Sequence, residues 1–505
     1  LVSAHQSIGC KAIIEFGTPE QKERWLPKMA REELGAFCLS EPAVGSDAGS
    51  IETTCRLSED GSHYVLDGEK KWATSGAWSG LFTVVARLET PAERTGGTAA
   101  LVCTPEMEGI DIYEPNRSKC GIRGTWQARI RFRDVRVPRD HLLHEEGEGL
   151  RVALRCLNFG RCTLSAGVLG AAKQASEQAI KWVRTRRQFD RPLIAFERVR
   201  ERVAEMRALL TATESMLYTA AGMLDRGDDD VMVETASAKV FASARCWTVI
   251  DHAMQLMGGE GYMHENELER IWRDHRIHRI VEGSNDVMRS FIFAYGSKQL
   301  VEEMLALREG LSWDDAEPTL RNVRRIGGHL TDRRLLGRGL SIGRSWLGWG
   351  SVRRVERPPV GKALEDEAER LARMVGRFHG AVQRAALRER ENLVSRQSVQ
   401  APLADASMLL FAAGCVLARL DTEDHAGTLP GGDGWIGGNE DRPEEAESVA
   451  SSRYFLDWAE GRFEEYLNRA DGAPASMEEA AEAASSWVEG LPDEPFHLPE
   501  LYDAG

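Results

Sequence analysis

The chain has 505 residues, of which 42% are hydrophobic and 28% are charged, and its formal net charge is −15. These proportions exclude collagen-like, coiled-coil and wholly disordered proteins, and the length allows about two to four domains. No apolar run reaches the roughly 18 residues of a membrane-spanning helix, and the best candidate, 408–420, is expected to be a buried helix.

The first predicted region, 1–35, is helical. Thr18, Pro19 and Gln21 have the spacing of a helix start, with an N-cap, a proline in the first turn and the third residue of a capping box. A helix is therefore predicted over 19–31. The sequence does not begin with Met and opens on what reads as the middle of a helical domain, so we expect the native start to be absent.

The spacing of apolar residues changes twice along the middle of the chain. Short alternating runs separated by Gly, Pro and Asp turns predict a small antiparallel β domain over 36–146, with strands near 63–67, 82–87, 99–104 and 129–137. From 147 to 300 the apolar period is 3.6, which predicts a helical bundle with long helices over 150–184, 196–225 and 230–257.

A basic linker is predicted over 301–362. Between 319 and 357 the sequence has ten arginines against Asp332 and Glu356, and Trp and Leu residues are interleaved with them. This mixture is typical of segments that bind a membrane surface. A surface loop whose arginines pair with the acidic end of the chain is an equal alternative. No nucleic-acid motif accompanies the charge, so nucleic-acid binding is not expected.

The last region, 363–505, is predicted to form a second helical domain, with helices over 363–394 and 401–420. It also carries the acidity of the chain, because 421–505 contains 22 Asp and Glu against 4 Arg and no Lys.

Cysteine and histidine usage gives no sign of a metal site. The nine cysteines are scattered without a CxxC pair, as in the reduced thiols of an intracellular protein. His275 and His278 are spaced like metal ligands, but arginines flank them, so no metal is expected.

Two segments of the β region carry residues suited to binding. In the first, 37–47, Gly45 lets the backbone approach a ligand closely and Ser46 supplies a hydroxyl, which suits a phosphate group. About thirty residues later, Trp72 lies two positions before Thr74. An indole beside a hydroxyl suits an aromatic cofactor, although a tryptophan in a β core is the more common case.

Two further segments lie in the helical region. The segment 255–262 ends a helix with glycines, which taken alone is only a C-cap. In 281–289, Glu282 precedes Gly283 and a Ser-Asn-Asp cap that opens the next helix. The carboxylate is therefore expected at the positive end of a helix dipole.

In this order and spacing, the four segments resemble the acyl-CoA dehydrogenase family over about 1–300. Further matches lie at 120–124, 135–138, 158–161, 186–189 and 273–277. The resemblance implies an α+β multidomain fold, in which the end of an N-terminal helical domain is followed by an antiparallel β domain and a flavin-binding helical bundle. The remainder is similar to the very-long-chain branch, whose C-terminal extension forms a second helical domain and contacts membrane.

The resemblance implies that the chain binds FAD. Trp72, Ala73 and Thr74 would flank the isoalloxazine ring, with the Thr74 hydroxyl near N5. The other residues implied to line the flavin and its pyrophosphate are Phe37, Leu39, Ser40, Gly45, Ser46, Ser284, Asn285 and Asp286. The adenine half would be held from the neighbouring subunit, which implies at least a homodimer, by Arg186, Phe189, Gln255, Gly258 and Gly259.

The resemblance also assigns a base and a substrate. Glu282 would abstract the α-proton of a long- or very-long-chain acyl-CoA while the β-hydride passes to flavin N5, giving a trans-2-enoyl-CoA. That proton is weakly acidic, so the reaction needs a carboxylate whose pKa is raised by burial. Some branches carry the base just before the Arg161 position, where this chain has Gly160. The residues implied to contact acyl-CoA are Ser46, Asn158, Arg161 and Gly283.

The implied setting is fatty acid β-oxidation, with electrons passed to an electron-transfer flavoprotein. The implied location is the cytoplasm or membrane surface of a bacterium, or the mitochondrial inner-membrane surface of a eukaryote. Departures at Ser75, Trp126 and Asp190 concern subunit and flavin-edge packing. Two alternatives stay open: an acyl-CoA oxidase on the same fold, and a membrane-associated assembly protein that has lost turnover.

Overall fold

The computed structural model describes residues 2–89, 97–228, 230–311, 355–425 and 443–472, together with 480, 483 and 484. The chain divides into two compact units. The first comprises 1–298, 356–372 and 407–460, and the second comprises 299–355, 373–406 and 461–505. Residues 319–354 of the basic segment, for which membrane contact is expected, lie outside the described residues.

Three short helical elements open the first unit: the π-helix η1 (Ala4–Gly9), α1 (Lys11–Phe16) and α2 (Pro19–Met29). The predicted capping box of α2 is confirmed, because Thr18 and Gln21 exchange hydrogen bonds between side chain and backbone. Element η1 lies against strand β1 (Leu34–Cys38): the Gly35 N–H donates to His5 Nδ1 at 2.9 Å.

An eight-stranded sheet follows, in the order β6-β7-β3-β2-β4-β5-β8, with β1 paired to β4. Its further strands are β2 (Thr54–Leu57), β3 (His63–Thr74), β4 (Ser79–Leu88), β5 (Thr98–Cys103), β6 (Ile110–Glu114), β7 (Gln127–Pro138) and β8 (Leu142–Gly147). The pairing is mainly antiparallel, as predicted, but β1 and β2 each pair with β4 in parallel. Short 3-10 turns interrupt the sheet at Ala48–Ser50, Gly76–Trp78 and Arg139–His141.

Strand β3 changes the face of its side chains near its end. Tyr64, Leu66 and Lys70 are buried, as the period of two requires. The register with β7 then shifts between Lys70 and Ala73, and Trp72 has a left-handed φ of 63°. The extra residue turns Trp72 outward and buries Ala73.

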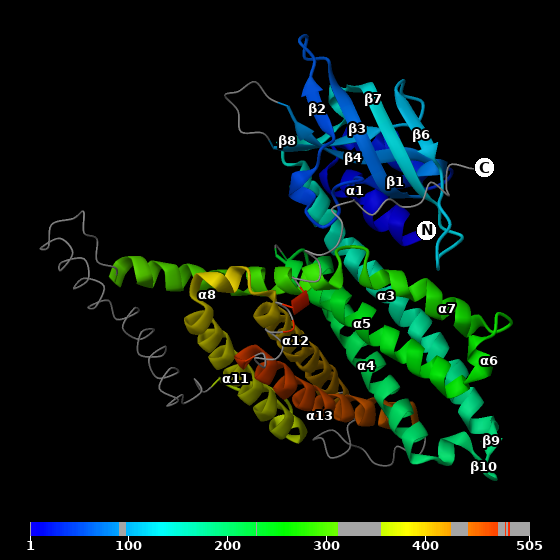
Figure 1. Cartoon of the computed structure of the whole chain (residues 1–505), viewed down its shortest axis with the longest axis vertical. Coiled ribbons are helices and arrows are strands. Elements are labelled where there is room, and N and C mark those ends of the chain that lie inside the picture. Colours follow the sequence, from blue (N-terminus) through cyan, green and yellow to red (C-terminus); the bar gives the residue numbers. More distant parts are fainter. Residues whose placement is uncertain are drawn as a thin grey trace, which may run out of the picture. The chain divides into compact units, whose positions relative to one another are not determined.

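The helical bundle of the first unit consists of α3 (Gly149–Thr185), α4 (Glu197–Arg226), α5 (Met232–Met257), α6 (Gly259–Tyr262), α7 (Glu267–His275), the 3-10 turn η6 (Arg276–Arg279) and the start of α8 (Asn285–Leu311). The three long helices α3, α4 and α5 lie side by side (Figure 1). A two-stranded hairpin, β9 (Arg187–Gln188) and β10 (Arg191–Pro192), and the 3-10 turn Leu193–Ala195 join α3 to α4. The positions of α3, α4 and α5 agree with the predicted helices.

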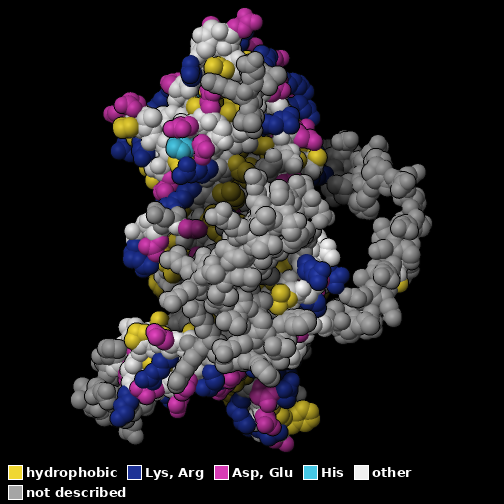
Figure 2. Space-filling model, turned by 90° about the vertical axis from the view of Figure 1, so that its left-hand side faces the viewer, with side chains coloured by type: hydrophobic (Ala, Val, Ile, Leu, Met, Phe, Trp, Pro, Cys, Tyr) yellow, Lys and Arg dark blue, Asp and Glu magenta, His cyan; other side chains and the backbone are white. Residues whose placement is uncertain are grey.

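Helices α11 (Glu365–Glu389), α12 (Gln397–His425) and α13 (Pro443–Asp471), with 3-10 turns at Lys362–Leu364 and Arg390–Val394, follow the basic segment. Residues of the predicted extension 363–505 contribute to both units. Residues 397–424 of α12 are long and apolar enough to cross a membrane, contrary to the expectation from apolar runs, but 61% of the most apolar window is buried, as in a core helix. On the face shown in Figure 2, Lys and Arg side chains are interspersed with Asp and Glu over the described surface.

Candidate active site

Glu282 lies in the short loop between η6 and α8. The backbone is left-handed at both Glu282 and Gly283, with φ of 57° and 90°. This conformation is strained for a residue with a side chain, and such strain collects at functional sites. The carboxylate reaches α3, since a Cβ built on Gly160 would lie 2.8 Å from Glu282 Oε2. That oxygen is buried and has no hydrogen-bond partner among the described residues.

The surroundings of Glu282 set its proton affinity. Burial raises the pKa of Glu282 to about 7, and the charges of Arg161 and Lys239 oppose this rise. Desolvation outweighs the two cations because no described residue donates a hydrogen bond to the buried oxygen. A carboxylate of this pKa can take up and release a proton near neutral pH, which a general base must do.

On α3, Asn158 and Arg161 form the wall beside this loop. Both side chains are buried, and Arg161 Nη1 donates to Asn158 Oδ1 at 3.2 Å. Arg161 Nη2 lies 3.7 Å from Met288 Sδ on α8, and its Nε is buried without a hydrogen-bond partner in the described part of the chain. The guanidinium thus has donor capacity left for a bound anion or carbonyl.

Lys239 on α5 was not among the residues predicted for the site. Its Nζ donates to the Gly283 carbonyl at 2.6 Å and to Asn285 Oδ1 at 2.9 Å. The Asn285 side chain is buried and also donates to Ser243 Oγ at 2.9 Å, so its amide group is turned into the protein. Ser284 is half-buried, and the Asp286 carboxylate is exposed. The signal for Lys239 was a lysine inside a run of small and apolar residues, 236–242.

A methyl group at Gly160 is expected to disturb the carboxylate without harming the fold. Its Cβ would lie 2.8 Å from Glu282 Oε2 and 2.9 Å from Ile8 Cγ2, so both side chains must move. With Glu282 as the base that the resemblance implies, we expect Gly160→Ala to reduce the rate of proton abstraction by about 10- to 100-fold, because catalysis is sensitive to small displacements of the reacting groups. The melting temperature should not fall, since alanine favours a helix over glycine.

The matched control is Gly167→Ala on the same helix, where a Cβ meets nothing within 4 Å. It should leave both the rate and the melting temperature at or above the wild-type values. Full activity in Gly160→Ala would show that Glu282 is not held against α3 in the working protein.

The first binding segment follows β1. Phe37 and Leu39 pack on a small apolar cluster with Val44. Lys71 N–H donates to the Ser40 carbonyl at 2.8 Å, which ties the segment to β3. Gly45 and Ser46 at the tip of the loop are exposed, and a Cβ at Gly45 would meet nothing within 4 Å. The loop tip therefore leaves room for a ligand at the backbone.

A buried ion pair lies under this loop. Lys70 Nζ is 2.6 Å from Glu41 Oε1 and also donates to the Leu39 carbonyl at 3.1 Å. The Glu41 carboxylate accepts hydrogen bonds from the backbone N–H groups of Glu52 and Thr53. Both charged side chains are almost fully buried. The pair fixes the strand-to-loop junction from below.

Trp72 and Thr74 lie at the end of β3. The indole is 47% exposed, so Trp72 is not a core residue of the sheet. Ala73 is buried, and Thr74 Oγ1 donates to Gln127 Oε1 at 3.1 Å. The Ser75 hydroxyl is buried and has no hydrogen-bond partner among the described residues. This edge thus combines an open aromatic surface with a hydroxyl that lacks a partner.

The residues predicted for the adenine half form a second group. Arg186, Gln255, Gly258 and Gly259 are exposed, and the Phe189 side chain is 86% exposed. Gln255 lies 16 positions beyond Lys239 on α5, which at 1.5 Å per residue is about 24 Å. The structure therefore does not bring this group to Glu282 within one chain.

These features fit a flavin dinucleotide. The outward indole of Trp72 offers a stacking surface, and the backbone is open at Gly45, Gly258 and Gly259. The unpaired Ser75 hydroxyl and Glu282 Oε2 are polar atoms that a bound molecule could satisfy.

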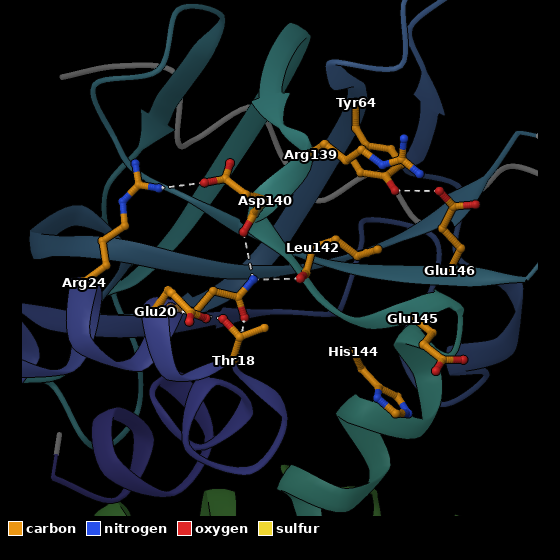
Figure 3. Close-up of a pocket in the computed structure, with 11 residues that line it drawn as sticks. Thr18, Glu20, Arg24, Tyr64, Arg139, Asp140, Leu142, His144, Glu145 and Glu146 are labelled. Carbon is orange, nitrogen blue, oxygen red and sulfur yellow. Dashed lines mark hydrogen bonds and ion pairs between the residues drawn. The ribbon is translucent and has the colours of Figure 1, made fainter.

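A pocket of about 820 Å³ lies elsewhere, between α2 and the sheet (Figure 3). None of the predicted site residues lines it. Two pairs of its lining residues contact each other: Arg24 forms an ion pair with Asp140, and the Tyr64 hydroxyl donates to Glu146. Gln21 donates to the carbonyls of Asp140 and Leu142. The contacts of Arg24 and Gln21 join α2 to the β domain, and we assign the pocket no part in the chemistry.

Comparison with known proteins gives matches to three family models. They are described as acyl-CoA dehydrogenase N-terminal domain (residues 1–33), middle domain (36–135) and C-terminal domain (147–295). The chain is 35% identical over 423 residues to the human very long-chain specific acyl-CoA dehydrogenase, mitochondrial, covering 83% of this chain. It spans 62% of the length of that relative.

Solved structures of acyl-CoA dehydrogenases also match this chain. An acyl-CoA dehydrogenase from Bacillus anthracis, complexed with FAD, matches with a TM-score of 0.70 and 25% identity, covering 97% of this chain and 78% of that one. Butyryl-CoA dehydrogenase from Megasphaera elsdenii matches with a TM-score of 0.55 and 32% identity, covering 59% and 76%.

Proposed function

Since the chain belongs to the acyl-CoA dehydrogenase family, we propose that it oxidises acyl-CoA thioesters to trans-2-enoyl-CoA, with FAD as its cofactor and Glu282 as its general base. The observation that carries this proposal is the buried Oε2 of Glu282, which no described residue hydrogen-bonds and which is held on a left-handed loop beside Gly160. Arg161 and Lys239 supply the cations that keep its carboxylate form accessible.

The chain itself supplies the group that removes the α-proton of the substrate. The Glu282 carboxylate takes the α-proton, and its raised pKa makes it a stronger base than an exposed glutamate. FAD, when bound, would accept the β-hydrogen as a hydride, which carries the two electrons removed from the substrate. Trp72, Thr74 and the loop around Gly45 would hold its flavin end. Because Glu282 Oε2 is buried, the proton that it takes up is shielded from exchange with solvent.

The oxidation rate is expected to depend on the protonation of Glu282. Only the deprotonated carboxylate can accept the α-proton, so the rate should rise with pH through about 7, the raised pKa, and fall away below it. The measurement is the anaerobic rate of flavin reduction at saturating acyl-CoA across this range. A midpoint near the ordinary value of 4.5 would mean that the base is solvent-exposed or is a different carboxylate.

We further propose long- or very-long-chain acyl-CoA as substrate, fatty acid β-oxidation as the setting, and an electron-transfer flavoprotein as acceptor. The similarity to very long-chain specific relatives supports this choice. The exposed second group around Phe189 supports FAD sites shared in a homodimer. A peripheral membrane contact through 319–357, at a bacterial membrane or the mitochondrial inner membrane, rests on the ten arginines of that segment.

The proposal is tested by product analysis. The FAD-loaded protein is incubated with palmitoyl-CoA and an artificial electron acceptor, and the thioester is examined by mass spectrometry. Loss of two hydrogens from the acyl chain, dependent on the acceptor, is expected. Equal conversion with air alone, with hydrogen peroxide formed in the same amount, would identify an oxidase. No conversion at any chain length would favour an assembly protein without turnover.

A further inference from the structure

Lys239 occupies a position that a stable helix bundle would ordinarily fill with an apolar side chain. It is fully buried on α5, within a stretch of residues 235–243 that are all buried. Its Nζ makes hydrogen bonds to two neutral oxygens, Gly283 O at 2.6 Å and Asn285 Oδ1 at 2.9 Å. Burying a cation costs free energy that neutral acceptors recover only in part. Packing alone therefore does not explain this lysine.

The two acceptors lie on either side of Ser284, at the junction of the Glu282 loop with α8. Gly283 has a left-handed φ of 90°, directly after the left-handed Glu282. Lys239 bonds both the Gly283 carbonyl and the Asn285 side chain. These two bonds fix the direction in which the chain leaves the turn. Asn285 is held in addition by Ser243 on α5. The strained turn is thus tied to α5 at two points.

The charged groups around the turn come from four elements. Glu282 faces Lys239 and Arg161 of α3, and Lys239 also faces Arg289 of α8 and His278 of η6. Burial lowers the pKa of Lys239 to about 7, and Glu282 raises it. Burial lowers the pKa of His278 to about 4, so that imidazole is neutral where the reaction is proposed to run. Lys239 Nζ is bonded to the carbonyl of Gly283, the residue directly after Glu282.

We propose that Lys239 is the positioning residue of the Glu282 loop: it anchors Gly283 and Asn285 to α5 and so holds the Glu282 carboxylate against α3. Its effect on catalysis rests on the proposed function, whereas the anchoring of the loop does not.

The test is Lys239→Met, which keeps the length of the side chain and removes its donor and charge. Hydrogen–deuterium exchange of the FAD-loaded protein without acyl-CoA should become about tenfold faster across 281–286, with little change elsewhere in the bundle. The matched control is Lys181→Met, which removes an exposed lysine of α3 paired with Glu177. Its exchange should equal that of the wild type.

The second readout is the pH dependence of flavin reduction. Removing the Lys239 charge should slow reduction by about 10- to 100-fold and raise the pH midpoint by about one unit, because a cation that favours the Glu282 carboxylate is lost. Wild-type exchange across 281–286 would show that Lys239 does not anchor the loop, and an unchanged midpoint would show that its charge does not act on Glu282. If Lys239→Met does not fold, Asn285→Ala removes one anchor and should show the same exchange increase to a smaller extent.

The two readouts separate the proposals. If the wild-type protein oxidises no acyl-CoA, the proposed function fails, and the exchange experiment still decides whether Lys239 anchors the loop.

Discussion

Replacing Glu282 by glutamine is expected to slow acyl-CoA oxidation by about 10²- to 10⁴-fold, the usual contribution of a general base. The amide has the shape of the carboxyl group but cannot accept the α-proton. FAD binding should be retained, because the flavin contacts are assigned to other residues. Stability should stay equal or rise, since the variant removes a buried charge whose desolvation is only partly offset by Arg161 and Lys239.

The measurement is anaerobic stopped-flow reduction of the flavin by palmitoyl-CoA, with flavin content and melting temperature determined on the same preparations. The matched control is Glu265→Gln, which changes an exposed glutamate outside the loop. The flavin of this variant should be reduced at the wild-type rate. If Glu282→Gln were reduced as fast as the wild type, the base would be another residue and the account of the loop would be wrong.

Lys70→Met is expected to destabilise the protein by about 3–5 kcal/mol, the usual cost of removing one partner from a buried ion pair. The Glu41 carboxylate would remain almost fully buried without its cation. Burial tends to raise the pKa of Glu41, but the hydrogen bond and charge of Lys70, with backbone donors, lower it overall. Without Lys70 the desolvation of Glu41 is no longer compensated. FAD affinity should also fall, because Lys70 holds the Leu39 carbonyl under the binding loop.

The free energy of unfolding is measured by urea denaturation at several pH values. In Lys70→Met the pKa of Glu41 should be raised, so protonation removes the buried charge and the difference from wild type should narrow as the pH falls. Lys181→Met, which breaks an exposed pair, should cost under about 1 kcal/mol. A loss for Lys70→Met as small as that of the control would show that the buried pair does not stabilise the loop junction.

Local patterns in the sequence predicted much of the fold. The capping box at Thr18 and Gln21 and the long helices α3, α4 and α5 follow from residue spacing alone. The parallel pairing of β1 and β2 with β4 was beyond such reasoning, because strand partners distant in sequence leave no trace in periodicity.

At Trp72, the usual alternation of buried and exposed side chains along a strand predicts the wrong face. It has the same parity as Tyr64, Leu66 and Lys70, which are buried, so a regular strand would bury it as well. The left-handed φ at Trp72 and the register shift beside it reverse the faces, and the indole is exposed. The backbone conformation at Trp72 alone therefore determines whether the indole packs in the core or is exposed for stacking.

Lys239 and Lys70 were missed for a common reason. A lysine is normally predicted to lie at the surface, because lysine side chains are rarely buried without a partner. Both lie in positions that periodicity assigns to the interior, one in a buried helical stretch and one on the inner face of β3. Their partners, Gly283 and Glu41, lie 44 and 29 residues away in sequence, so only the fold brings them together.

The most direct test of the central claim is an anaerobic absorbance titration of the FAD-loaded wild-type protein with palmitoyl-CoA. We predict that the oxidised flavin band is lost in proportion to the acyl-CoA added. Bound FAD that keeps its oxidised spectrum with acyl-CoA of every chain length, short to very long, would contradict the account.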